Sequence, residues 1–284
     1  MINKKYYIEV IRKNSKEMFP IETGIREKGR IGERIKSVLF DVYGTLFVSG
    51  SGDISISEKE AHERELARVL LKYGMDMDPH VAYSKYINCI KMEHERLKSR
   101  GIDYPEVKID MIWKNVLNIG IFKARKVAIE YETMVNPVWP MPGAYELLSQ
   151  LKMKGVELGI ISNAQFYTPV MFEALMGIPI YKLGFNNKLV FFSYRYSTSK
   201  PSLNMFKLAC EKLRKIGLKP ENTIYVGNDI LNDIKPAIEV GFKSVLFAGD
   251  KRSLRLREDD NRCFDITPDI IVTSLINILS RINL

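Results

Sequence analysis

Acidic, hydroxyl, amide and lysine side chains follow the apolar runs of this sequence at positions where they could do hydrolytic chemistry. Some lie directly behind an apolar run, and one lies in a loop before a proline. In chain order they are Asp41, Tyr43, Thr45, Ser162, Asn163, Lys200, Asp229 and Asp233. A carboxylate held rigid at the tip of a buried strand can act as a nucleophile, so Asp41 is the candidate for that role.

The remaining residue types suit a substrate that carries negative charge. Thr45 and Ser162 offer hydroxyls, and Asn163 offers an amide donor for an oxyanion or a phosphate. Lys200 would orient Asp41 and offset charge on the substrate. Hard oxygen ligands from Asp229 and Asp233, together with Asp41, suit one Mg²⁺ ion. The set predicts a hydrolase site that forms a covalent intermediate.

Short apolar runs alternating with amphipathic stretches predict the elements that position these residues. The predicted strands are 37–40, 156–161, 189–192, 223–226 and 243–247, and the predicted helices between and after them are 168–175, 201–215, 233–240 and 269–281. Strands separated by helices of this length form parallel βαβ units. The predicted fold is therefore α/β, a doubly wound parallel sheet of Rossmann-like type, with the reactive groups at the carboxyl ends of its strands.

The alternation of strands and helices is interrupted after the first strand by a long segment with helical periodicity only. Charged stretches with helical spacing predict four long helices, at 58–73, 79–98, 105–118 and 122–135. The predicted organisation is a basic extension at 1–35, a core made of 36–52 and 138–284, and an all-helical domain at 53–137. His62, His80 and His94 all fall in that helical domain without ligand spacing, so exposed positions are expected for them.

Four motifs resemble those of the haloacid dehalogenase superfamily of hydrolases, in the same order. They are FDVYGTLF, IISNAQF, SKPSLNMF and YVGNDILNDIKPA. The resemblance covers about residues 36–284, and the helical insertion lies where that superfamily places its cap domain.

The resemblance implies a role for each matching residue. Asp41 would be the nucleophile that forms an aspartyl intermediate, and Lys200 would bridge it to the transferring group. Thr45, Ser162 and Asn163 would hold that group. The implied Mg²⁺ ligands are Asp41, the backbone carbonyl of Tyr43, Asp229, and Asp233 directly or through water. Asn228 departs from the acidic residue often found just after the glycine.

Tyr43 is the informative departure, because the phosphatases of this superfamily usually carry a second Asp at that position as general acid and base. A tyrosine with a pKa near 10 is a poor proton donor to the leaving group. General acid–base catalysis raises a reaction rate by ~10²–10⁴-fold, so its absence should slow the reaction. The first motif, D-x-Y-G-T, also resembles that of the metal-free 2-haloacid dehalogenases. We therefore expect a Mg²⁺-dependent phosphatase acting on a small phosphorylated metabolite, with dehalogenase chemistry or a binding protein of little turnover as alternatives.

The charge of the chain indicates which class of binding partner to expect. Lys and Arg number 43 against 34 Asp and Glu, a formal charge of +9 spread along the chain. Nucleic acid is not expected as a partner, because proteins that bind it usually concentrate basic residues on one element. A small anionic substrate is expected instead.

There is no apolar run of about 18 residues, so no membrane span is expected. The three cysteines are too scattered for a disulfide framework, and the N-terminal residues do not resemble a signal peptide. A cytoplasmic location is therefore expected. The basic extension is expected to cover a sheet edge, with a role in a homodimer or a mobile segment as the alternatives.

Overall fold

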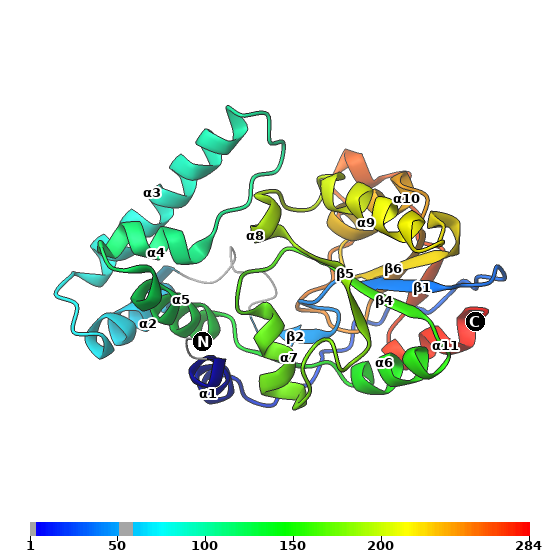
Figure 1. Cartoon of the computed structure of the whole chain (residues 1–284), viewed down its shortest axis with the longest axis horizontal. Helices are drawn as coiled ribbons and strands as arrows, with labels where there is room; N and C mark the ends of the chain where they lie inside the picture. Colours follow the sequence, from blue (N-terminus) through cyan, green and yellow to red (C-terminus); the bar gives the residue numbers. More distant parts are fainter. Residues whose placement is uncertain (1–3, 51–58) are drawn as a thin grey trace.

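Six parallel strands form the central sheet, in the order β5-β4-β1-β6-β7-β8 (Figure 1). The structure is a computed structural model and describes residues 4–50 and 59–284. The strands are β1 (Ser37–Phe40), β4 (Glu157–Ser162), β5 (Phe185–Phe192), β6 (Thr223–Gly227), β7 (Lys243–Phe247) and β8 (Ile270–Val272). Near-continuous burial along β1, β6 and β7 is typical of parallel strands covered on both faces. The predicted α/β fold is confirmed.

Helices cover both faces of this sheet. They are α6 (Ala144–Met153), α7 (Thr168–Met176), α8 (Ser193–Tyr196), α9 (Asn204–Lys215), α10 (Lys235–Glu239) and α11 (Ile278–Arg281). Successive side chains of a strand point to opposite faces. Accordingly, Val38 and Phe40 belong to the core cluster that contains residues of α6, α7 and α11, whereas Leu39 packs with Phe206 of α9 in a second cluster.

Four helices form a unit beside the sheet (Figure 1), which we call the helical unit. They are α2 (Lys59–Lys72), α3 (Pro79–Lys98), α4 (Ile109–Leu117) and α5 (Ile121–Val135). Trp113 is fully buried at their centre, with ring centroids 4.6 Å from Tyr86 and 5.1 Å from Tyr131. No helix in the two described ranges is both long enough and apolar enough to cross a bilayer.

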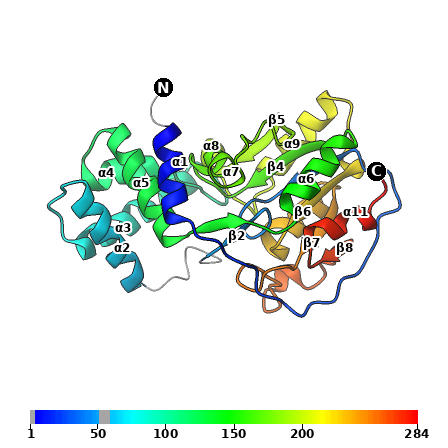
Figure 2. The same ribbon diagram turned by 90° about the horizontal axis from the view of Figure 1, so that it is seen from below.

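The helical unit is joined to the core through a ribbon that the sequence did not predict. β2 (Phe47–Ser49) precedes the unit, β3 (Val138–Pro140) follows it, and the two pair antiparallel (Figure 2). A second connection to the core lies just before α4. The helix predicted at 105–118 is wrong in its first part, because α4 begins only at Ile109. Residues 105–108 instead form a loop against the core, where the backbone N–H of Glu106 donates to the Ser197 carbonyl at 3.1 Å.

The N-terminal extension runs from the helical unit to the far edge of the sheet. Its helix α1 (Lys4–Asn14) packs on α5 and α7. Further along, Lys28 and Ile271 exchange backbone hydrogen bonds of 3.1 and 2.9 Å, so the extension covers the edge strand β8 as expected. The predicted closing helix 269–281 is wrong in its first part, because residues 270–272 pair with β7 as a strand and α11 begins only at Ile278.

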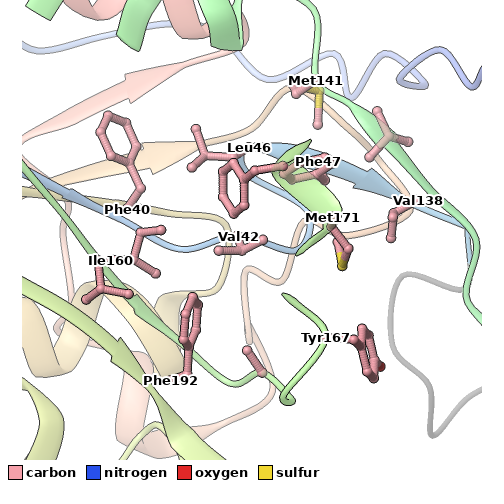
Figure 3. Close-up of a cluster of buried hydrophobic side chains, with 14 of the residues drawn as sticks. Phe40, Val42, Leu46, Phe47, Val138, Met141, Ile160, Tyr167, Met171 and Phe192 are labelled. Carbon is pink, nitrogen blue, oxygen red and sulfur yellow. The ribbon is translucent and has the colours of Figure 1, made fainter. Parts of the chain in front are cut away.

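An apolar cluster supports the loop that follows β1. Phe40 and Val42, on either side of Asp41, are both fully buried. Figure 3 shows them in one cluster with Phe47, Met171 and Phe192. Dense packing of this kind fixes the backbone on both sides of Asp41.

Candidate active site

One cavity of about 650 Å³ opens between the carboxyl ends of the strands and the helical unit. Most of the predicted site residues line it: Asp41, Tyr43, Asn163, Lys200, Asp229 and Asp233. Thr45 and Ser162 are fully buried and are not among its described lining residues. The parallel sheet brings these distant residues together, because all of its strands end at the same edge.

Asp41 and Lys200 form a buried ion pair at the end of β1. Asp41 is 7% exposed and Lys200 is 5% exposed. Lys200 Nζ lies 2.8 Å from Asp41 Oδ1. This is the one ion pair of Asp41 within the described residues, so its second oxygen, Oδ2, is left for a substrate or a cation. The Asp41 backbone N–H donates to the Val226 carbonyl at 2.9 Å, which ties the carboxylate to the neighbouring strand β6.

Asp233 holds the other side of the Lys200 ammonium group. Lys200 Nζ donates to Asp233 Oδ1 at 2.5 Å and to the hydroxyl of Tyr225 at 3.2 Å. Burial by itself would lower the pKa of Lys200, but Asp233 and Asp41 together raise it above its ordinary value. Lys200 therefore stays a cation. Asp233 Oδ2 accepts from the backbone N–H groups of Asn228 and Asp229, both at 3.0 Å, so this carboxylate is fully engaged within the protein.

Two more polar contacts link the loops around Asp41. Asn163 Oδ1 accepts from the Lys200 backbone N–H at 2.7 Å, and Asn163 Nδ2 donates to the Lys200 carbonyl at 3.3 Å, beside a cis peptide bond to Pro201. Thr45 Oγ1 donates to Asn228 Oδ1 at 3.1 Å. The Ser162 hydroxyl has no hydrogen-bond partner among the described residues. Asn163 and Thr45 thus fix the loops to each other.

Tyr43 directs its hydroxyl toward α7. The oxygen lies 2.8 Å from Thr168 Oγ1 and donates to Met171 Sδ at 3.3 Å. Burial raises the pKa of Tyr43 above its ordinary value. A hydroxyl that holds its proton this firmly is a weak general acid. The geometry agrees with the expectation that Tyr43 does not take over the role of the missing second Asp.

Asp229 forms an ion pair with Arg257, which was not among the predicted site residues. Arg257 donates from Nε to Asp229 Oδ1 at 3.1 Å and from Nη2 to Oδ2 at 2.6 Å. Asp229 Oδ1 also accepts from the backbone N–H groups of Leu231 and Asn232 and so caps the π-helical turn η3 (Ile230–Ile234). The helix predicted to begin at residue 233 is thus preceded by this turn, which begins at Ile230.

The oxygen atoms around Asp41 suit Mg²⁺ only in part. No cluster of three or more His, Cys, Asp and Glu side chains within residues 4–50 and 59–284 is arranged for a metal. Mg²⁺ is nevertheless often bound through one or two carboxylates, with other oxygens and water completing its shell. The Asp41 carboxylate, which keeps its Oδ2 for attack, suits it through its other oxygen, and Asp229 suits it once Arg257 moves aside. The Arg257 side chain is 33% exposed, so it lies at the boundary between the protein and solvent.

Arg255 and Arg257 reach the cavity through loop pairing. Both residues line the cavity. They lie in the segment after β7, which contains three arginines within six residues, Arg252, Arg255 and Arg257. Arg255 exchanges backbone hydrogen bonds of 2.9 and 3.0 Å with Ile230 and Asn228. These arginines after a predicted strand were a usable signal, because loops at strand ends carry site residues.

Further lining residues come from the helical unit and the loop before α4, and the ionisable ones include His62, His94, Glu106 and Glu132. The expectation of an exposed His62 is wrong. It is 4% exposed, and its Nδ1 shares a hydrogen bond of 2.7 Å with the hydroxyl of Tyr131. Local sequence offers no signal for these residues, because charged residues in helices usually face solvent.

Comparison with known proteins adds a family and several relatives. The family model of haloacid dehalogenase-like hydrolases matches residues 35–241, which confirms the predicted hydrolase. The chain is 28% identical over 211 residues to a protein of Methanocaldococcus jannaschii named glyceraldehyde 3-phosphate phosphatase, covering 74% of this chain and 84% of that protein.

Two solved structures share the fold. One is a HAD phosphatase from Thermococcus onnurineus, with a TM-score of 0.54 and 17% identity over 88% of this chain and 100% of the other. The second is a 2-haloacid dehalogenase from Pseudomonas syringae, with a TM-score of 0.57 and 18% identity over 87% of this chain and 99% of the other. Because one structure of each kind is similar, this likeness shows the fold alone, and the named relative favours phosphatase chemistry.

Proposed function

Because the chain belongs to the haloacid dehalogenase-like hydrolases, we propose that it is a phosphatase that cleaves small phosphate monoesters through an aspartyl phosphate on Asp41. The observation that carries this proposal is the buried pair of Asp41 and Lys200, 2.8 Å apart, with Asp41 Oδ2 left for attack. The name of the Methanocaldococcus jannaschii relative supports a small phosphorylated metabolite and makes glyceraldehyde 3-phosphate the first substrate to test.

The reaction would proceed in two displacements at phosphorus. In the first, Asp41 Oδ2 forms a bond to phosphorus while the bond from phosphorus to the organic oxygen breaks, and the departing oxygen takes a proton from solvent. In the second, a water molecule forms a bond to phosphorus and the bond to Asp41 breaks, which releases phosphate and restores the carboxylate. Throughout, Lys200 offsets the negative charge gathered around Asp41.

Mg²⁺ is the proposed cofactor, and the helical unit is the proposed cap over the site. When bound, the ion would supply positive charge that offsets that of the phosphoryl oxygens. Asp41, the carbonyl of Tyr43 and Asp229 would hold it. Asp233 remains a predicted ligand, although its hydrogen bonds to Lys200 and to two backbone N–H groups favour a role in positioning Lys200.

The test is hydrolysis of glyceraldehyde 3-phosphate, acetyl phosphate and p-nitrophenyl phosphate with Mg²⁺, with EDTA, and by Asp41→Asn. Acetyl phosphate and p-nitrophenyl phosphate have leaving groups that need little protonation, so the absent acid at Tyr43 does not hide an active nucleophile. We expect turnover that needs both Mg²⁺ and Asp41.

The exposed Asp265→Asn serves as the matched control and should behave as wild type. Halide release from 2-chloropropionate that persists in EDTA would instead support the dehalogenase alternative, which Tyr43 favours because halide needs no proton. Absence of turnover with every substrate would support a binding protein.

A further inference from the structure

The helical unit and the core give the cavity two sides of different character. The acidic residues that line it from the helical unit are Glu106, in the loop between α3 and α4, and Glu132 on α5. The lysine and arginine residues among its described lining residues all come from the core, and they are Lys200, Arg255 and Arg257. Among the described lining residues, the helical unit supplies no lysine or arginine, and its ionisable bases are the histidines His62 and His94.

Both acidic residues are held in place by hydrogen bonds. Glu132 is 4% exposed and accepts from the hydroxyl of Tyr86 at 3.1 Å. Glu106 accepts from Ser193 Oγ at 2.7 Å and from Gln165 Nε2 at 3.2 Å, so it is fixed against the core. Burial raises the pKa of each carboxyl group to about 7, so the charge on both groups increases as the pH rises above neutrality.

Aromatic rings line the cavity around these carboxylates. The imidazole of His62 stacks on the ring of Tyr83 at a centroid distance of 5.3 Å, and Tyr83 stacks on Tyr86 at 6.2 Å. Ile87 and Ile90 add apolar surface from the same helix. At about 650 Å³ the cavity lies in the range of sites for ligands of drug size, so a ring-sized group fits beside the phosphate.

With the phosphate at Asp41, the organic part of the substrate would extend toward the lining residues of the helical unit, which form the other side of the cavity. A second anionic group there would be repelled by the two carboxylates, and this repulsion is stronger beside buried groups than in bulk water. Resting on the proposed phosphatase function, we propose that the site selects phosphate monoesters with an uncharged or cationic organic part and rejects those that carry a carboxylate or a second phosphate there. Glu106 and Glu132 are the specificity-determining residues.

A series of ring-matched substrates tests this selection at pH 8. Phenyl phosphate, 4-(aminomethyl)phenyl phosphate and 4-carboxyphenyl phosphate differ mainly in the charge opposite the phosphate. We expect kcat/KM for the first two to exceed that for the carboxylated substrate by about tenfold or more, as repulsion of about 1.4 kcal/mol would give. Glu106→Gln, Glu132→Gln and the double variant should reduce this ratio, the double variant to within about threefold.

Glu146→Gln, on the exposed surface of α6, is the matched control and should keep the wild-type ratio. Dissociation constants of the three compounds, measured by calorimetry with Asp41→Asn, give a second readout that needs no turnover. Hydrolysis of none of the compounds would count against the proposed phosphatase function, and the dissociation constants would still decide the selection. Equal constants for the three, or a ratio that the Gln variants leave unchanged, would overturn the inference.

Discussion

Replacing Glu132 by Gln should stabilise the protein at alkaline pH. Glu132 is 4% exposed on α5, and burial raises its pKa from 4.5 to about 7. The folded protein thus binds this proton more tightly than the unfolded chain does. The stabilising effect of the protonated group is fully present below pH 4.5 and is lost as the pH rises through about 7. Gln keeps the shape and an acceptor for Tyr86 without acquiring a charge.

The pKa difference sets the magnitude of this effect. Wild type loses about 3 kcal/mol of unfolding free energy between its acid form and pH 8, and about 1 kcal/mol at pH 5. Glu132→Gln avoids the loss, so its melting temperature should exceed that of wild type by roughly 5–10 °C at pH 8 and by much less at pH 5.

Thermal unfolding followed by circular dichroism at both pH values, at one ionic strength, measures the difference. The exposed Glu146→Gln should show no change at either pH, because it removes a charge without relieving burial. A Glu132→Gln variant less stable than wild type at pH 8, or a shift in melting temperature equal at both pH values, would refute the linkage argument.

Two further predictions concern the charged groups around Asp41. Lys200→Met leaves Asp41 and Asp233 buried without their shared cation, so we expect loss of activity and a destabilisation of about 3–5 kcal/mol in urea unfolding; a change below 1 kcal/mol would contradict the role of Lys200 as the common partner. Arg257→Gln frees Asp229 and should tighten Mg²⁺ binding up to about fivefold by calorimetry without substrate, whereas weaker binding would show that Arg257 does not compete with the ion.

The sequence by itself determined the sheet and the central site residues. β1, β6 and β7 are short apolar runs bounded by turns, and their burial on both faces follows from that pattern. Because parallel strands end at one edge, the positions of Asp41, Asn163 and Lys200 in the chain were enough to bring them into one cavity. The same reasoning failed at β8, whose three residues are too few for a periodicity; pairing with β7 and Lys28 decides that strand.

Only the tertiary structure decided which charged residues are buried and what they contact. Glu132 and His62 lie in helices whose charge pattern is that of solvated surfaces, and packing of the helical unit against the core turns both into the cavity. Arg257 reaches Asp229 from 28 positions along the chain because the loop after β7 pairs with the turn after β6. Burial and ion pairing depend on which surfaces meet, and local sequence carries no record of that.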